Sequence, residues 1–131
     1  MSNNSLIAIF TVLGIVILLG GVFLYPKSPY ANGALDGFAQ CLSSKGIKMY
    51  GEYWCPHCQN QKAAFGDSFK YINYVECSEE VGKCAAAGIE GVPAWTLPDG
   101  EQLVGEQKLE ALSTASGCEL PAQSSSTQIP L

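Results

Sequence analysis

The sequence predicts one small α/β domain over residues 34–118, with a central four-stranded mixed sheet flanked by helices. Helix-like and strand-like patterns alternate there in the order α, β, α, β, α, β, β, α, and the two consecutive strands form a hairpin pattern. A length of 131 residues leaves room for one such domain. Residues 119–131 show no pattern, and we expect them to be disordered.

An apolar segment over residues 6–25 contains no charged residue. Its length is that of a helix crossing a bilayer core of roughly 30 Å. We interpret it as a transmembrane anchor between a tail (residues 1–5) and a linker (residues 26–33). A cleaved signal peptide is the alternative, but the run exceeds the roughly 7–15 apolar residues of such a peptide, and no positive charge precedes it.

Two observations bear on the orientation of this anchor, and they point to opposite sides of the membrane. Lys27 lies on the domain side, and a count of positive charges would place the domain in the cytoplasm. Six cysteines suit an oxidising compartment instead. We therefore expect a single-pass protein of the cytoplasmic membrane with its domain on the extracytoplasmic side. The net charge of −5 excludes nucleic acid from the expected partners.

The individual elements follow from periodicity and from start and stop signals. Leu35, Phe38 and Leu42 recur at helical spacing, and Gly46 follows as a stop. Ser78 with two acids after it is typical of a helix N-cap. The predicted helices cover residues 34–44, 59–69 and 78–87 and a last segment ending at 117–118, and the predicted strands cover residues 47–53, 71–77, 94–97 and 101–105.

The segment YWCPHC, residues 53–58, joins the first predicted strand to the next helix. Disulfide exchange needs one accessible thiolate and a second thiol that resolves the mixed disulfide. At a helix start, backbone N–H groups and the helix dipole favour the thiolate of Cys55, and Cys58 lies one turn further along. The neighbours that we expect to tune this pair are Glu52, Trp54, Pro56 and His57.

A Pro-His dipeptide between the cysteines favours an oxidant or isomerase, because a stabilised thiolate stabilises the reduced form. A zinc site is one alternative, with Cys77 and Cys84 completing four thiolate ligands. The long gap between those two cysteines and the secreted context argue against it, and we expect no metal or other cofactor. A purely structural disulfide is the other alternative, but so short a ring adds little stability.

Val92 and Pro93 precede the third predicted strand. The simple interpretation is a turn proline. A cis bond between them would instead direct the backbone of Val92 toward the cysteine pair, where it would bind an extended substrate as an added strand. The four remaining cysteines allow three pairings.

These features together resemble the thioredoxin fold. More closely, the segments FAQCL, YWCPHCQNQKAAFG, YVECS and GVPAW are similar to the thioredoxin-like domain that is fused to, or accompanies, bacterial vitamin K epoxide reductase homologues. The resemblance covers about residues 35–118. It implies Cys55 as the nucleophile, Cys58 as the resolving cysteine and Pro93 as the cis-proline.

The resemblance also implies the disulfides Cys41–Cys118 and Cys77–Cys84. We interpret both as structural, and the alternative is that Cys77 and Cys84 relay electrons to the cysteine pair. It further implies that oxidising equivalents pass between a quinone-linked membrane protein and exported proteins that contain cysteines. We expect that membrane partner, similar to vitamin K epoxide reductase or to DsbB, to be a separate chain.

One position departs from the family pattern. Many thioredoxin-like proteins carry a buried acid six residues before the nucleophile, and here that residue is Met49. Glu52 is near but would face the other side of an alternating strand, so the proton route runs through water or through Glu52.

The sequence thus predicts a membrane-anchored, extracytoplasmic thiol–disulfide oxidoreductase that oxidises or isomerises disulfides in exported proteins. A thiol reductase for cytochrome or cuproprotein maturation is the first alternative. A metal-binding module without catalytic activity is the second.

Overall fold

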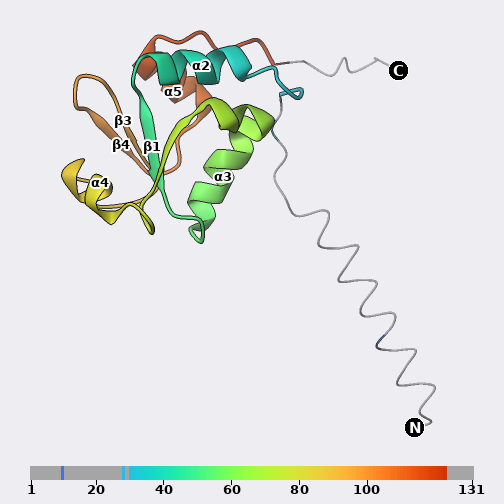
Figure 1. The fold of residues 1–131 in the computed structure, drawn as a ribbon. Helices are drawn as coiled ribbons and strands as arrows, with labels where there is room; N and C mark the ends of the chain where they lie inside the picture. Colours follow the sequence, from blue (N-terminus) through green and yellow to red (C-terminus); the bar gives the residue numbers. More distant parts are fainter. Residues whose placement is uncertain (1–9, 11–27, 29, 124–131) are drawn as a thin grey trace, which may run out of the picture.

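The structure, a computed structural model, describes residues 10, 28 and 30–123 of the chain. Figure 1 shows how the helices and strands of the domain are arranged. In chain order they are α2 (Asp36–Ser44), β1 (Lys48–Gly51), α3 (Pro56–Phe65), the 3₁₀ helix η1 (Gly66–Tyr71), β2 (Asn73–Glu76), α4 (Val81–Ala86), β3 (Ala94–Thr96), β4 (Gln102–Val104) and α5 (Leu109–Ser116).

The four strands form one mixed sheet in the order β2-β1-β3-β4. Strand β1 pairs with β2 in parallel and with β3 antiparallel, and β3 and β4 form the antiparallel hairpin. The predicted four-stranded mixed sheet is confirmed, and this architecture fits an α/β thioredoxin-like fold. Strand β1 is an inner strand with β2 and β3 as its neighbours, so the loop that follows β1 begins between these two strands.

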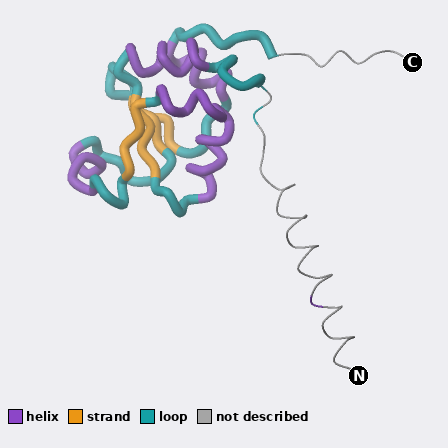
Figure 2. The backbone as a smooth tube through the Cα atoms, turned by 45° about the vertical axis from the view of Figure 1, so that its right-hand side comes forward, coloured by secondary structure: helices purple, strands orange, loops and turns teal. Residues whose placement is uncertain are grey.

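The two faces of the sheet carry cores of different size. Met49 and Trp95 are register partners with no exposed surface, and they face the larger core under α2, α3 and α5. In that core the ring of Phe65 packs against Phe38 and Trp95, with centroid distances of 6.0 and 5.8 Å. Tyr50 faces the opposite side, where a smaller cluster lies against α4. Helices therefore cover both faces (Figure 2).

The helix after the cysteine motif differs from the prediction at both ends. It begins at Pro56 rather than residue 59, because a proline at the first helical position has a suitable φ and needs no hydrogen-bond partner. It ends at Phe65, because Gly66 adopts φ 55°. The chain then continues as η1 to Tyr71, where the sequence had predicted a helix to residue 69.

The start of α4 was also predicted wrongly. The helix begins at Val81, and Ser78 does not cap it. The hydroxyl of Ser78 instead donates to the carboxylate of Glu76 at 2.5 Å. Because its side chain is already satisfied by the preceding strand, Ser78 forms part of a turn before the helix.

Both ends of the chain extend beyond the described residues. The predicted tail (residues 1–5) lies outside them, as does the predicted anchor (residues 6–25) except for residue 10. Within the part of the chain that the structure describes, no helix is long and apolar enough to cross a membrane. At the other end, Leu120 packs against the larger core.

Candidate active site

Cys55 occupies the N-cap of α3, and the structure of this helix end determines what its sulfur contacts. The backbone of Cys55 is extended (φ −76°, ψ 118°), and Pro56 begins the helix. Its Sγ accepts a hydrogen bond from the backbone N–H of Cys58 at 3.3 Å. The first N–H groups of a helix have no partner within the helix, so they are free to donate to a group at this position.

The loop before β3 completes the surroundings of Cys55. The Val92–Pro93 peptide bond is cis. The Cys55 thiol lies 3.9 Å from the carbonyl oxygen of Val92, close enough to donate to it. The structure thus brings together Cys55, Cys58, Val92 and Pro93, which are far apart in the sequence.

The two thiols differ in accessibility. Cys55 is 6% exposed and Cys58 is fully buried. Burial raises the pKa of Cys58 to about 12, together with its hydrogen bond to Cys55 and the charge there. The backbone N–H of Glu52 and the ammonium of Lys62 act in the opposite direction. Cys58 is therefore a thiol at neutral pH, and it must lose its proton before it attacks a disulfide.

The residues that we expect to tune the cysteine pair differ in their exposure and in their contacts. His57 is 72% exposed at its side chain, and its Nδ1 lies 3.2 Å from Oε2 of Glu106. Trp54 is 61% exposed beside the motif. Glu52 hydrogen-bonds to Cys58 through its backbone. Its side chain lines a groove of about 500 Å³ on the α4 side of the sheet, together with Val92.

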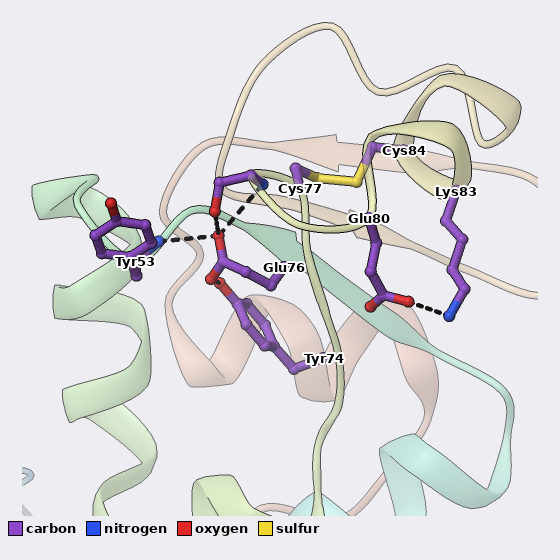
Figure 3. Close-up of a disulfide and its surroundings, with 8 residues drawn as sticks. Tyr53, Tyr74, Glu76, Cys77, Glu80, Lys83 and Cys84 are labelled. Atoms are coloured by element: carbon purple, nitrogen blue, oxygen red, sulfur yellow. Dashed lines mark hydrogen bonds and ion pairs between the residues drawn. A yellow bond between two sulfur atoms is a disulfide. The ribbon is translucent and has the colours of Figure 1, made fainter.

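A polar cluster on β2 was not predicted from the sequence. The hydroxyl of Tyr74 donates to Oε2 of Glu76 at 2.6 Å, and Oε1 of Glu76 accepts from the backbone N–H of Tyr53 at 3.1 Å and from the hydroxyl of Ser78 (Figure 3). From α3, the ammonium of Lys62 lies 3.8 Å from the centroid of the Tyr74 ring. Tyr74 and Glu76 are two residues apart on a strand, so they share a face, which is the one signal the sequence offered.

Burial and hydrogen bonds determine the protonation states of Glu76 and Tyr74. Burial of Glu76 alone would raise its pKa, but the hydrogen bonds from Ser78, Tyr74 and Tyr53 outweigh that effect and lower it. Burial and the bond to Glu76 raise the pKa of Tyr74. The pair is therefore a neutral phenol and an ionised carboxylate at neutral pH.

Gln61 is a buried polar residue that the sequence did not indicate. Its Oε1 accepts from the backbone N–H of Gln107 at 2.6 Å and from the indole N–H of Trp95 at 3.4 Å, and its Nε2 donates to the carbonyl of Gln107 at 3.0 Å. These bonds connect α3 to the segment before α5 and to the core beneath the cysteine motif.

The other four cysteines form two disulfides. Cys41 is bonded to Cys118 and Cys77 to Cys84, with S–S distances of 2.07 and 2.01 Å. This is the pairing that the family resemblance implied. Two of the four sulfurs that the alternative zinc site would need, those of Cys77 and Cys84, are bonded to each other. Among the residues that the structure describes (10, 28 and 30–123), no group of three or more His, Cys, Asp or Glu side chains is arranged to hold a metal ion.

The comparisons with known proteins agree with this chemistry. No family model matches the chain. The chain is 40% identical over 112 residues to the thiol-disulfide oxidoreductase LTO1 of Arabidopsis thaliana. The aligned region covers 79% of this chain and 28% of that protein. The chain therefore spans less than a third of the length of this curated relative.

Proposed function

We propose that this chain is a thiol–disulfide oxidoreductase that acts through Cys55 and Cys58. The observation that carries the proposal is the position of Cys55. Its sulfur lies at the N-terminus of α3, accepts from the N–H of Cys58, and has the carbonyl of Val92 within 3.9 Å. The name of the plant relative, a thiol-disulfide oxidoreductase, supports the same class of reaction.

In the oxidising direction, a substrate thiolate attacks Sγ of Cys55 in the Cys55–Cys58 disulfide. That disulfide breaks, and Cys58 leaves as a thiolate and takes up a proton. A second substrate thiolate then attacks the substrate sulfur of the mixed disulfide, and Cys55 leaves. The substrate dithiol loses two electrons and two protons, and the enzyme disulfide becomes a dithiol.

The backbone of Val92 would hold the substrate during this exchange. An extended peptide beside it would place its own cysteine next to Cys55, in the manner of an added strand. The exposed ring of Trp54 offers further contact area for such a peptide.

We propose oxidation or isomerisation, rather than reduction, as the main direction. The support is the pair of residues between the cysteines, Pro56 and His57, together with the N-cap position of Cys55. Each favours the thiolate and so the reduced form of the enzyme, which makes its disulfide an oxidant. A reductase for cytochrome or cuproprotein maturation remains the competing function.

The cellular setting is proposed from the sequence. The chain is anchored in the cytoplasmic membrane by residues 6–25, its domain faces the extracytoplasmic side, and its substrates are exported proteins with cysteines. A separate membrane protein, similar to vitamin K epoxide reductase or to DsbB, re-oxidises Cys58 and Cys55. The two further disulfides support an oxidising compartment.

Oxidative refolding of reduced ribonuclease tests the proposed activity. Cys55→Ser is expected to abolish catalysis, because no other thiol takes its place at the helix N-terminus. Cys58→Ser is expected to accumulate mixed disulfides through Cys55. Circular dichroism checks that both variants are folded. A folded Cys55→Ser variant with full activity would contradict the proposal.

A further inference from the structure

The buried acid that the thioredoxin-like pattern would place on β1 is replaced by Met49, which has no polar group to receive the proton of Cys58. The neighbouring strand supplies polar groups at the same level. In the parallel register of β1 and β2, Tyr74 lies opposite Met49 and Glu76 lies opposite Gly51. Register partners have their side chains on the same face of a sheet. Tyr74 and Glu76 therefore lie on the α3 side, where Cys58 is buried.

Tyr74 and Cys58 both lie close to Gly51. A Cβ atom at this glycine would lie 3.1 Å from Oη of Tyr74 and 3.2 Å from Sγ of Cys58. Both atoms thus border the same small space, which is available because residue 51 has no side chain. The hydroxyl of Tyr74 donates to Glu76, and an oxygen that donates one proton still has lone pairs to accept another.

We propose that Tyr74 and Glu76 form the proton route of the resolving thiol Cys58. The proposal rests on the thiol–disulfide exchange proposed above and names residues that act where Cys58 gains or loses its proton. Cys58 takes up a proton when it leaves in the oxidising direction, and it gives one up in the reverse of that step, when it attacks a mixed disulfide. When Cys58 attacks Cys55 in a mixed disulfide, its proton passes to Oη of Tyr74 while the proton of Tyr74 passes to Oε2 of Glu76. A Cys55–Cys58 bond forms, and the bond to the substrate sulfur breaks.

The step balances without a further reactant. The substrate sulfur leaves with the electron pair of the broken bond and takes a proton from water. Glu76, which is partly exposed, returns its proton to solvent, and Tyr74 is neutral before and after. In this step Tyr74 exchanges the proton with Cys58 directly, whereas Glu76 acts through Tyr74 and is a positioning residue.

Two charged groups face this route, the ammonium of Lys62 and the carboxylate of Glu76. Lys62 lies over the Tyr74 ring and stabilises the anion that forms on Cys58. Glu76 is held ionised by the N–H of Tyr53 and the hydroxyl of Ser78, so it is available as the acceptor. On the other side of Cys58 lies Cys55, which is part of the mixed disulfide at this stage and carries no charge.

The reaction of the reduced full chain with 5,5′-dithiobis(2-nitrobenzoic acid) separates the two halves of the exchange. Attack by Cys55 releases one coloured thiolate in a first phase. Attack by Cys58 on the resulting mixed disulfide releases the second. Stopped-flow absorbance gives both rates over a range of pH for the wild type, Tyr74→Phe, Glu76→Gln and the control Tyr71→Phe. The control removes a hydroxyl from another half-buried tyrosine that also lies under a lysine, Lys70.

In Tyr74→Phe and Glu76→Gln, the second phase is expected to slow by on the order of 100-fold near neutral pH, the lower end of what positioned proton transfer contributes. The loss should shrink as the pH rises, because hydroxide then removes the proton of Cys58. The first phase and the Tyr71→Phe control should keep wild-type rates.

Three outcomes would overturn the assignment. One is a second phase at the wild-type rate in both variants. Another is a slowing that stays the same at high pH, which indicates displacement of Cys58 rather than loss of a proton route. The third is an equal loss in the control. Absence of the first phase in the wild type would instead count against the proposed function itself.

Discussion

Gly51 lies directly opposite Glu76 in the parallel register of β1 and β2. The space above Gly51 is shared by the sulfur of Cys58 and the ring of Tyr74. Because Gly51 has no side chain, Cys58 and Tyr74 can both lie against this space.

Gly51→Ala tests this close approach. The new methyl group would lie 3.1 Å from Tyr74 and 3.2 Å from the sulfur of Cys58, both tighter than ordinary contact. We expect a loss of stability of about 1–3 kcal/mol from overpacking, measured by urea unfolding, and a slower second phase in the reaction described above. Gly37→Ala is the matched control, because nothing lies within 4 Å of its added Cβ. Equal effects of the two substitutions would contradict the packing argument.

Replacing His57 tests its expected role in tuning the potential. His57→Ala removes the imidazole two residues after Cys55, and we expect the reduced form to lose part of its stabilisation, so that the disulfide becomes a weaker oxidant. We expect the reduction potential to fall by on the order of 30 mV, a tenfold change in the equilibrium constant. Asn60→Ala is the control, since Asn60 also reaches Glu106 from α3 but has an amide in place of the imidazole. A potential that rises in His57→Ala would contradict this role.

The two disulfides are expected to stabilise the fold to different extents. The sequence separations are 77 residues for Cys41–Cys118 and 7 for Cys77–Cys84. Chain entropy then predicts losses of about 4.5 and about 2.5 kcal/mol on replacing each pair by serine. Chemical unfolding measures both. If the Cys77/Cys84 variant folds but no longer catalyses exchange, an electron relay through that pair becomes the better hypothesis.

Glu76 is expected to make stability depend on pH in the acid range. Its pKa is lower in the folded chain than its ordinary value of 4.5, so it contributes stability above that value and the contribution is lost as the pH falls. Glu76→Gln should therefore be less stable than the wild type at neutral pH, with a smaller difference in acid. Unfolding curves at several pH values measure this. Glu101→Gln, in the turn between β3 and β4, is the control that removes a carboxylate elsewhere on the domain.

The sequence predicted the parts of the site that depend on neighbouring residues. Cys55, Cys58 and Pro93 belong to short motifs whose chemistry follows from spacing and local structure. The four-stranded sheet followed from the order of patterns. The roles of Tyr74 and Glu76 depend on the register of β1 and β2, which no single segment specifies. Ser78 was predicted wrongly because its hydroxyl has a tertiary partner that competes with the helix end.

Gln61 illustrates the same limit in the core. A polar residue on a predicted helix is most often exposed, but here it is fully buried and accepts from Trp95 and Gln107. Both partners lie more than thirty residues further along the chain, so only the assembled fold shows why a glutamine is suitable there.

The reduction potential of the Cys55–Cys58 pair tests the central claim most directly. Equilibration with glutathione buffers, followed by alkylation and mass analysis, reports the fraction of the pair that is oxidised while the two other disulfides stay intact. An oxidant or isomerase is expected to show a potential less negative than about −230 mV, on the side of protein disulfide isomerase and DsbA. A value near that of thioredoxin, about −270 mV, would contradict the proposed direction and favour a reductase.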